Sequence, residues 1–174
     1  MFDPAYNSPL DPKLLTQYKT VIFSDYKLGP VLFDAYKSNN FNGIEYVGSS
    51  FNQVLGDSFK KCTKLEKLTF GYDFDQNLSN SLHGLSSLTH LTFNGYFNQN
   101  LGNSLHGLSS LTHLTFGRFG CFNQNLGNSL HGLTTLTHLT FGYYFNQNLT
   151  NYLLQHHPQI ILVVMKYKYH QLNH

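Results

Sequence analysis

Hydrophobic residues recur along this chain with a period of about 23 residues. In the stretch 97–117 the apolar positions are Phe97, Leu101, Leu105, Leu108, Leu111, Leu114 and Phe116. The closing letters LTHLTF alternate, which predicts a short strand whose Leu114 and Phe116 point into a core. The three-residue spacing of the middle leucines, interrupted by Gly107, predicts a tight turn or short 3-10 segment over residues 104–110.

The period comes from internal copies. Residues 97–117 and 122–142 differ at two positions only, and 74–93 and 51–70 are further copies. Fainter matches extend the series, so that predicted strands end at Phe23, Tyr46, Phe70, Phe93, Phe116, Phe141 and Val164. Such self-similarity is typical of solenoids, in which each unit buries its apolar face against the next. We predict a leucine-rich-repeat-like repeat solenoid, with short parallel β-strands on an inner face and turns or 3-10 segments on an outer face.

The chain divides into three predicted parts within one domain. Residues 1–40 are expected to form an N-terminal cap with a degenerate repeat, residues 41–150 the repeats, and residues 151–174 a C-terminal capping repeat with an edge strand. A terminal cap is expected because the ends of a stack would otherwise expose its core.

Composition and charge exclude several classes of partner. The 174 residues are 41% hydrophobic and 11% charged, with a net charge of +2. We therefore expect no nucleic acid and no membrane as partner. The start has no signal-peptide pattern, and Cys62 and Cys121 suggest neither a disulfide framework nor a CxxC site. The expectation is a soluble, intracellular and most simply cytoplasmic protein without a cofactor.

One polar column is expected to support the fold. An Asn follows the first Phe of most copies, and Asp replaces it once: Asn52, Asp75, Asn98, Asn123 and Asn146. Asn side chains satisfy backbone groups at turns, so we predict a structural ladder. Asp75 cannot donate a hydrogen bond, which predicts a slightly weaker coil there.

The histidines form two columns. His90, His113 and His138 fall on the strands, where stacking would bring three imidazoles together. The alternatives are a transition-metal site or a plain exposed column copied by duplication, and the lack of acidic neighbours favours the latter, so we predict no metal. Mutual repulsion after protonation would make this column sensitive to pH. His83, His106 and His131 are expected to face solvent on the outer side.

The inner face is the predicted binding surface, because solenoids use such extended surfaces for partners. It is expected to run from Thr20 and Ile22 through Gly43 and Glu45, and to end at Ile161 and Val163. Its central residues are Lys67, Thr69, His90, Thr92, His113, Thr115, His138 and Thr140. The Thr column also resembles ice-binding arrays, although strands favour Thr in any case. Repeated residues define no unique catalytic centre, so no enzyme is predicted.

The C-terminal segment 160–169, from Ile160 to Tyr169, is apolar on both strand faces before it turns into a Lys-Tyr alternation. Two interpretations remain open. The strand caps the solenoid, with Ile161 and Val163 covered by the tail, or it pairs with another chain and allows self-association.

The letters FNQ recur in register at residues 51–53, 97–99, 122–124 and 145–147, each followed by a leucine-spaced turn and LTF or its equivalent. This unit resembles the FNIP repeat, a leucine-rich-repeat-related unit found in tandem in social amoebae and giant viruses of amoebae. The resemblance implies a repeat architecture and an unknown protein partner. Some members carry an F-box and resemble ubiquitin-ligase substrate adaptors. Residues 1–40 do not look like that helical module, so an adaptor role would need recruitment in trans.

Overall fold

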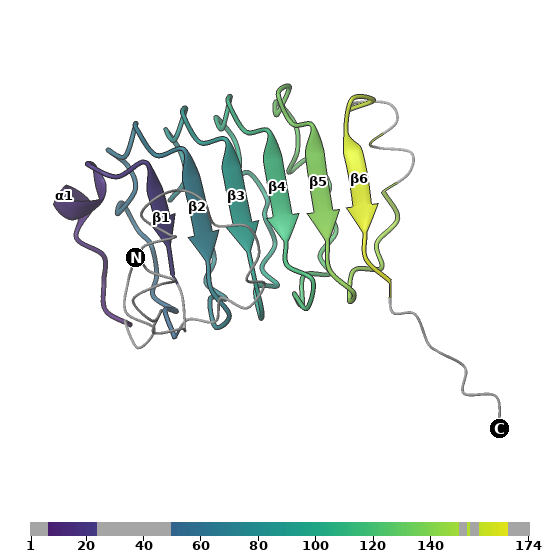
Figure 1. Ribbon diagram of the computed structural model, residues 1–174, viewed down its shortest axis with the longest axis horizontal. Coiled ribbons are helices and arrows are strands. Elements are labelled where there is room, and N and C mark those ends of the chain that lie inside the picture. Colours follow the sequence, from purple (N-terminus) through teal and green to yellow (C-terminus); the bar gives the residue numbers. More distant parts are fainter. Residues whose placement is uncertain (1–6, 24–49, 150–152, 154–156, 167–174) are drawn as a thin grey trace, which may run out of the picture.

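The computed structural model describes residues 7–23, 50–149, 153 and 157–166. The chain forms a stack of coils with one strand per coil (Figure 1). The strands lie side by side in one parallel sheet in sequence order. After a one-turn helix α1 (Pro12–Leu15), they are β1 (Thr20–Ile22), β2 (Lys67–Phe70), β3 (His90–Phe93), β4 (His113–Phe116), β5 (His138–Phe141) and β6 (Ile161–Val164). The predicted parallel-strand solenoid is therefore confirmed.

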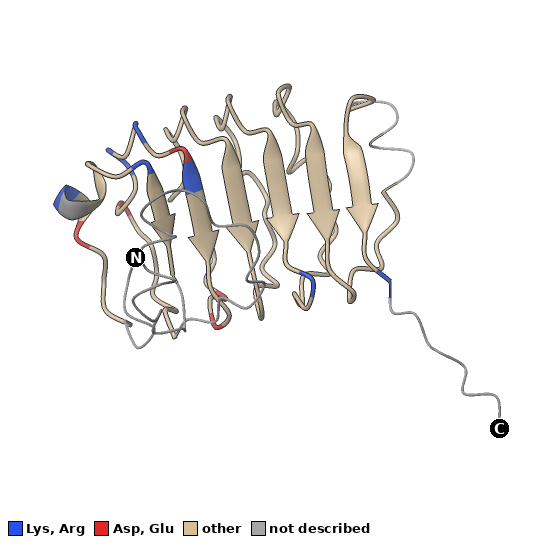
Figure 2. Ribbon diagram, viewed as in Figure 1, with Lys and Arg blue, Asp and Glu red and all other residues tan. Residues whose placement is uncertain are grey.

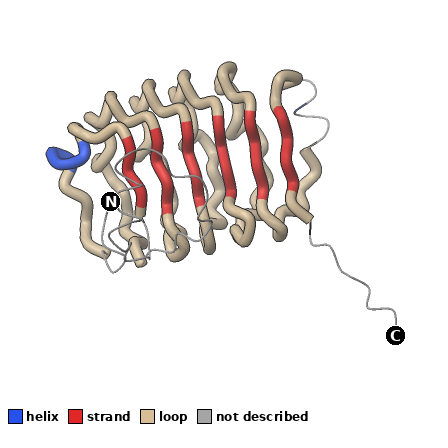
Figure 3. The backbone as a smooth tube through the Cα atoms, in the orientation of Figure 1, coloured by secondary structure: helices blue, strands red, loops and turns tan. Residues whose placement is uncertain are grey.

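The strands pair in the register of the repeat. His90 lies beside His113 and Leu91 beside Leu114, and the same match continues from β4 to β5. Strand ends predicted at Phe70, Phe93, Phe116, Phe141 and Val164 are all observed. Opposite the sheet, the middle of each coil is a run of turns, as Figure 3 shows. In one coil these turns are closed by bonds from Ser104 N to Leu101 O and from Leu111 N to Leu108 O.

Two columns of stacked phenylalanine rings fill one side of the core. The strand-end rings of Phe70, Phe93, Phe116 and Phe141 stack with centroids 5.2–5.7 Å apart. The rings that open each coil stack beside them at 6.0–6.2 Å, from Phe51 to Phe145. Columns of leucine, 0–2% exposed in the middle coils, complete the interior. Each coil buries its apolar side chains against both neighbours, so a single repeat would not be stably folded on its own.

The first two strands correct the predicted order of the stack. β1 pairs directly with β2, with Thr20 beside Lys67 and Ile22 beside Thr69. The strand predicted to end at Tyr46, with Gly43 and Glu45 on the binding face, lies outside the described residues, and its place between these strands is already taken. The sheet therefore contains six strands in the described chain rather than the seven that the sequence spacing suggested.

Ring stacking shows that the coil ending in β1 and the coil that begins at Phe51 are neighbours in the stack. Phe23 packs on Phe51 with centroids 4.1 Å apart, the same distance as between Phe70 and Phe74. Phe23 also stacks on Phe70, at 5.7 Å. In the sequence, residues 24–50 fall between Phe23 and Phe51, the two rings that meet at the corner after β1. The corresponding corner between Phe116 and Phe122 has five residues, two more than the corners after β2, β3 and β5.

The last strand is not covered on the side of the predicted binding face. Ile161 is 57% exposed and Val163 is 44% exposed. The tail that one of the two open interpretations places over these side chains lies outside the described residues, so that interpretation stays a prediction. The predicted domain boundaries at residues 40 and 150 fall outside the described residues and stay predictions.

Candidate binding face

The outward side of the sheet presents two parallel columns of side chains, which we call the strand face. Strand pairing places one column on Thr20, Lys67, His90, His113, His138 and Ile161. It places the second on Ile22, Thr69, Thr92, Thr115, Thr140 and Val163. All the residues predicted for the binding face on β2 to β5 therefore come together on one surface. Alternate residues, such as Leu114 and Phe116, point to the core.

Charge is confined to one end of this surface. Lys67 is exposed on β2, and just before it Glu66 forms an ion pair with Lys19, with 2.7 Å between Nζ and Oε1. Across β3, β4 and β5 the strands carry no Lys, Arg, Asp or Glu, as Figure 2 shows. The face therefore changes from charged, through neutral and polar, to apolar at β6.

The three strand-face histidines form a stacked column. The rings of His90 and His113 lie 4.3 Å apart between centroids and 9° from parallel. Those of His113 and His138 lie 4.2 Å apart and 4° from parallel. Each side chain is only partly exposed. Three flat rings in contact form a fixed platform rather than three independent flexible groups.

A threonine next to each histidine fixes its ring. Nδ1 of His90, His113 and His138 lies 2.9, 2.8 and 2.9 Å from the hydroxyl of the preceding Thr. The same hydroxyls, on Thr89, Thr112 and Thr137, bond to a backbone carbonyl of the previous coil at 2.9, 3.0 and 3.2 Å. The column is thus anchored to the coil-to-coil contacts that build the solenoid.

Burial and crowding make the imidazoles of His90 and His113 harder to protonate. The pKa of His90 is lowered from 6.5, first by desolvation and then by the charges of His113, Lys67 and His138. Desolvation and His138 likewise lower the pKa of His113. Both causes disfavour the imidazolium form. The neutral form of His90 and His113 is therefore favoured at neutral pH.

The geometry does not favour the metal site weighed from the sequence. Among the described residues, no group of three His, Cys, Asp or Glu side chains could hold a metal ion. Parallel rings send their nitrogen lone pairs in parallel directions, whereas a tetrahedral ion needs them to converge at about 2.0–2.1 Å.

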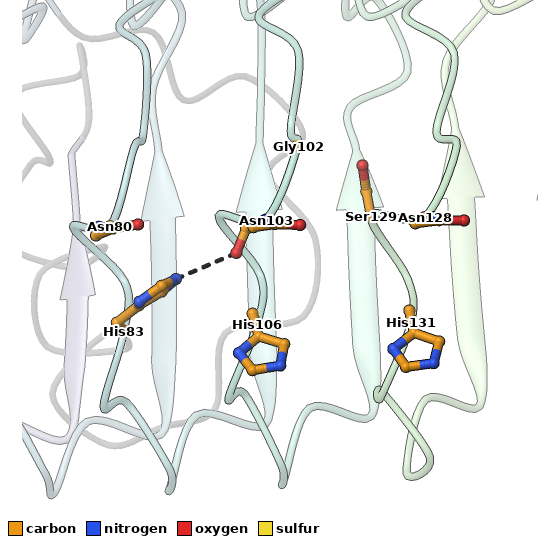
Figure 4. A pocket seen from close by; sticks show the side chains of 8 residues that line it. All are labelled: Asn80, His83, Gly102, Asn103, His106, Asn128, Ser129 and His131. Atoms are coloured by element: carbon orange, nitrogen blue, oxygen red, sulfur yellow. Dashed lines mark hydrogen bonds between the residues drawn. The ribbon is translucent and has the colours of Figure 1, made fainter.

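The second histidine column lies on the turn side and borders a shallow polar hollow of about 430 Å³. Figure 4 shows His83, His106 and His131 on three successive coils, beside Asn80, Asn103 and Asn128. His106 and His131 are exposed, as the sequence predicted for this column, and His83 is partly exposed. Nε2 of His83 lies 3.1 Å from the backbone oxygen of Asn103. These histidines are neither stacked like the strand column nor paired with a threonine.

A ladder of side-chain oxygens joins each coil to the next. Oδ1 of Asn98 accepts from the backbone N–H of Asn123 at 2.9 Å and from Nε2 of Gln124 at 3.2 Å. Asn52, Asp75 and Asn123 receive the same pair of bonds from the coil that follows each of them. Each oxygen therefore satisfies a backbone donor at a coil corner and orders a glutamine beside it.

The sequence analysis missed the first member of this ladder. Oδ1 of Asn7 accepts from Asn52 N at 3.0 Å and from Gln53 Nε2 at 2.9 Å. A signal was available, because the letters YNSPL at residues 6–10 match FNQVL at residues 51–55 in the aromatic, Asn and Leu positions.

The weaker coil expected at Asp75 stays a prediction, but its hydrogen bonds match those of the other coils. Its Oδ1 accepts both bonds at 2.9 Å. The Nδ2 atoms of Asn98 and Asn123 donate no hydrogen bond within the described chain, so a carboxylate at this position loses no donor that its neighbours use. Carboxylates are also the stronger acceptors.

Comparisons with known proteins add little beyond the fold. No protein-family description and no curated protein matches the chain. The chain is similar to the crystal structure of CroV588, described as a novel circular LRR protein, at 23% identity and a TM-score of 0.45. The match covers 94% of this chain and 30% of CroV588, so the chain spans less than a third of that protein's length. Within the described residues, no helix is both long and apolar enough to cross a bilayer.

The ladder makes a prediction about two replacements of one side chain. Asn98→Ala leaves two donors of the next coil without their acceptor and should lower the free energy of unfolding by about 1–3 kcal/mol. Asn98→Asp keeps the acceptor, as Asp75 does, and should cost much less. Urea unfolding followed by circular dichroism measures both, and equal losses for the two variants would show that the acceptor is not what matters.

Proposed function

We propose that this chain is a non-enzymatic protein-interaction module that binds its partner with the strand face of β2 to β5. Leucine-rich-repeat-like solenoids commonly serve as interaction scaffolds, because stacking gives them an extended surface made of many small, repeated contributions. In this proposal the repeats are of the FNIP type and the partner is another protein. The observation that carries it is the stacked column of His90, His113 and His138.

The column has the properties expected of a contact surface. Rigid, partly buried aromatic rings lose little side-chain entropy on binding, which is a large cost at most interfaces. The lowered pKa of His90 and His113 favours their neutral form, so binding there avoids the desolvation of a charge. The adjacent hydroxyls of Thr92, Thr115 and Thr140 add a polar group on each coil, so the platform combines flat apolar area with hydrogen-bonding atoms.

The lack of charge also supports a protein partner over a polyanion. Lys67 is the strand-face cation on β2, and no Lys or Arg follows it on β3 to β6. A nucleic acid or acidic membrane surface needs several cations in a row.

Matched histidine variants test this function. Peptides are first selected from a phage-displayed library on the immobilised full chain. Their affinity for the unchanged chain is then compared with their affinity for two triple variants. The strand-face variant changes His90, His113 and His138 to Ser; the control changes His83, His106 and His131 to Ser. We expect binding at least about tenfold weaker, or about 1.4 kcal/mol, for the strand-face variant and unchanged for the control. Selected peptides that tolerate the strand-face changes, or that need the outer-face histidines, would contradict the proposal. Circular dichroism of both variants checks that each remains folded.

Self-association is a second candidate, favoured by the exposed last strand. Ile161, Leu162 and Val163 are 57%, 41% and 44% exposed, and an unpaired strand edge is a template for another chain. A hollow of about 570 Å³, lined by Phe145, Leu149, Leu162 and Val164 among others, opens at this end of the core.

The self-association candidate predicts a concentration-dependent dimer. Val163→Lys places a charge on the edge strand and should shift the equilibrium to monomer, whereas Val54→Lys, at a distant residue that is 71% exposed, should not. Size-exclusion chromatography with light scattering reads out the mass. A monomer at the highest soluble concentration would end this candidate without affecting the binding role of the strand face.

A further inference from the structure

The hydrogen bonds of the threonines that precede the strand-face histidines, Thr89, Thr112 and Thr137, decide which histidine nitrogen carries the proton. A threonine hydroxyl has one hydrogen to donate and lone pairs to accept with. The hydroxyl of Thr112 touches two groups, the backbone oxygen of Thr89 at 3.0 Å and Nδ1 of His113 at 2.8 Å. A carbonyl oxygen only accepts, so the single hydroxyl hydrogen belongs to that contact.

The imidazole must then be the donor to the hydroxyl oxygen. If the hydroxyl instead gave its hydrogen to Nδ1, its oxygen would face the carbonyl oxygen lone pair to lone pair at 3.0 Å. The same arrangement occurs at Thr89 with His90 and at Thr137 with His138. Three copies of one geometry give three copies of one protonation pattern.

We infer that His90, His113 and His138 are each held as the Nδ1–H tautomer, so that their three Nε2 atoms form a row of bare hydrogen-bond acceptors suited to a partner that supplies N–H or O–H donors. Nε2 of these rings receives no hydrogen bond from the described chain, and it is not among the buried polar atoms that lack a partner, so it is accessible. The row is therefore open to a ligand. This inference deepens the proposed function by naming the chemistry of the partner's contact atoms.

In the histidine column on the turn side, His83 has its proton on the other ring nitrogen. Nε2 of His83 faces the backbone oxygen of Asn103 at 3.1 Å, and a carbonyl cannot donate. His83 is therefore held as the Nε2–H tautomer. The two sides of the solenoid carry the same residue type with the proton on different nitrogens.

Acid reverses the chemistry of the row. Once protonated, an imidazole donates from both nitrogens, so Nε2 no longer accepts from a partner and carries part of a positive charge. The charged and titratable groups near the column are Lys67 on the β2 side, with the Glu66–Lys19 ion pair beyond it, and the histidines themselves. On the far side, Ile161 of β6 adds no titratable group. These neighbours oppose protonation of His90 and His113, so the Nε2 atoms of these two rings still accept hydrogen bonds at neutral pH.

Nitrogen NMR tests the assignment directly on the uniformly ¹⁵N-labelled full chain. Long-range ¹H–¹⁵N correlation spectra distinguish protonated from bare ring nitrogens. At about pH 7.5 the three strand-face residues should show a protonated Nδ1 and a bare Nε2, and His83 the reverse. On acidification, Nε2 of His90 and His113 should become protonated only below pH 6.5, because their surroundings disfavour the charge.

One substitution isolates the cause. Thr112→Val removes the hydroxyl while keeping the side-chain shape, so His113 alone should lose its fixed tautomer, and His90 and His138 should keep theirs. Thr115→Val, on the same strand but without contact to an Nδ1 atom in the described structure, is the matched control and should change none of the three. A bare Nδ1 with a protonated Nε2 in the strand-face column would overturn the inference, as would a Thr112→Val variant whose His113 spectrum is unchanged.

The peptides selected on the strand face test the consequence for binding. Peptides bound at about pH 7.5 should carry donor side chains at the contact positions, and their affinity should fall about tenfold or more at about pH 5. Selected peptides that are rich in Asp and Glu and bind more tightly in acid would overturn the inference that the partner supplies hydrogen-bond donors. This holds even if the strand-face variant has already shown that the peptides bind at this face. Conversely, spectra as expected with no selected binder would leave the tautomers standing and reject the proposed function alone.

Discussion

The structure depends on one constraint: residues one repeat apart must lie directly on top of each other. The constraint is met by contacts that every coil makes with the next, namely the two columns of phenylalanine rings and the oxygen that Asn7, Asn52, Asp75, Asn98 or Asn123 offers to the following backbone N–H. Apolar stacking alone is not directional, whereas the hydrogen bond fixes height and rotation. Contacts between neighbouring coils are therefore sufficient to align all the strands.

The same constraint creates the strand face. Alignment of identical coils turns a single His-Leu-Thr-Phe strand into columns of like side chains, with leucine and phenylalanine inward and histidine and threonine outward. The threonine before each histidine bonds back to the previous coil, so the element that stabilises the stack also orients the ring. A two-residue insertion within residues 117–121 is accommodated at the corner after β4, between the stacked rings of Phe116 and Phe122, without disturbing either column.

Much of this was predictable from the sequence, and the misses have physical causes. Near-identical copies dictated the core and the members of both histidine columns. The strand placed near Tyr46 rested on spacing alone. Counted back from Tyr46 as Phe51 is from Phe70, a coil in that position would begin at Lys27. It would carry Leu28 and Gly29 where the ladder needs an acceptor and a glutamine, so the spacing satisfied the period but not the pattern of the ladder. The tautomer of His113 is fixed by the Thr112 hydroxyl, which lies between a carbonyl of the previous coil and Nδ1 of the ring. The repeat pattern alone does not reveal this position of the hydroxyl.

Oxidative cross-linking of paired cysteine substitutions measures the register most directly. Thr92 and Thr115 are neighbours on adjacent strands, so Thr92→Cys with Thr115→Cys should form a disulfide, detected by peptide mass mapping. Thr92→Cys with Thr140→Cys spans two strand spacings, about 9.6 Å, beyond the reach of about 7 Å for a disulfide, and should stay reduced. A cross-link between the distant pair, or none between the adjacent pair, would contradict the in-register stack.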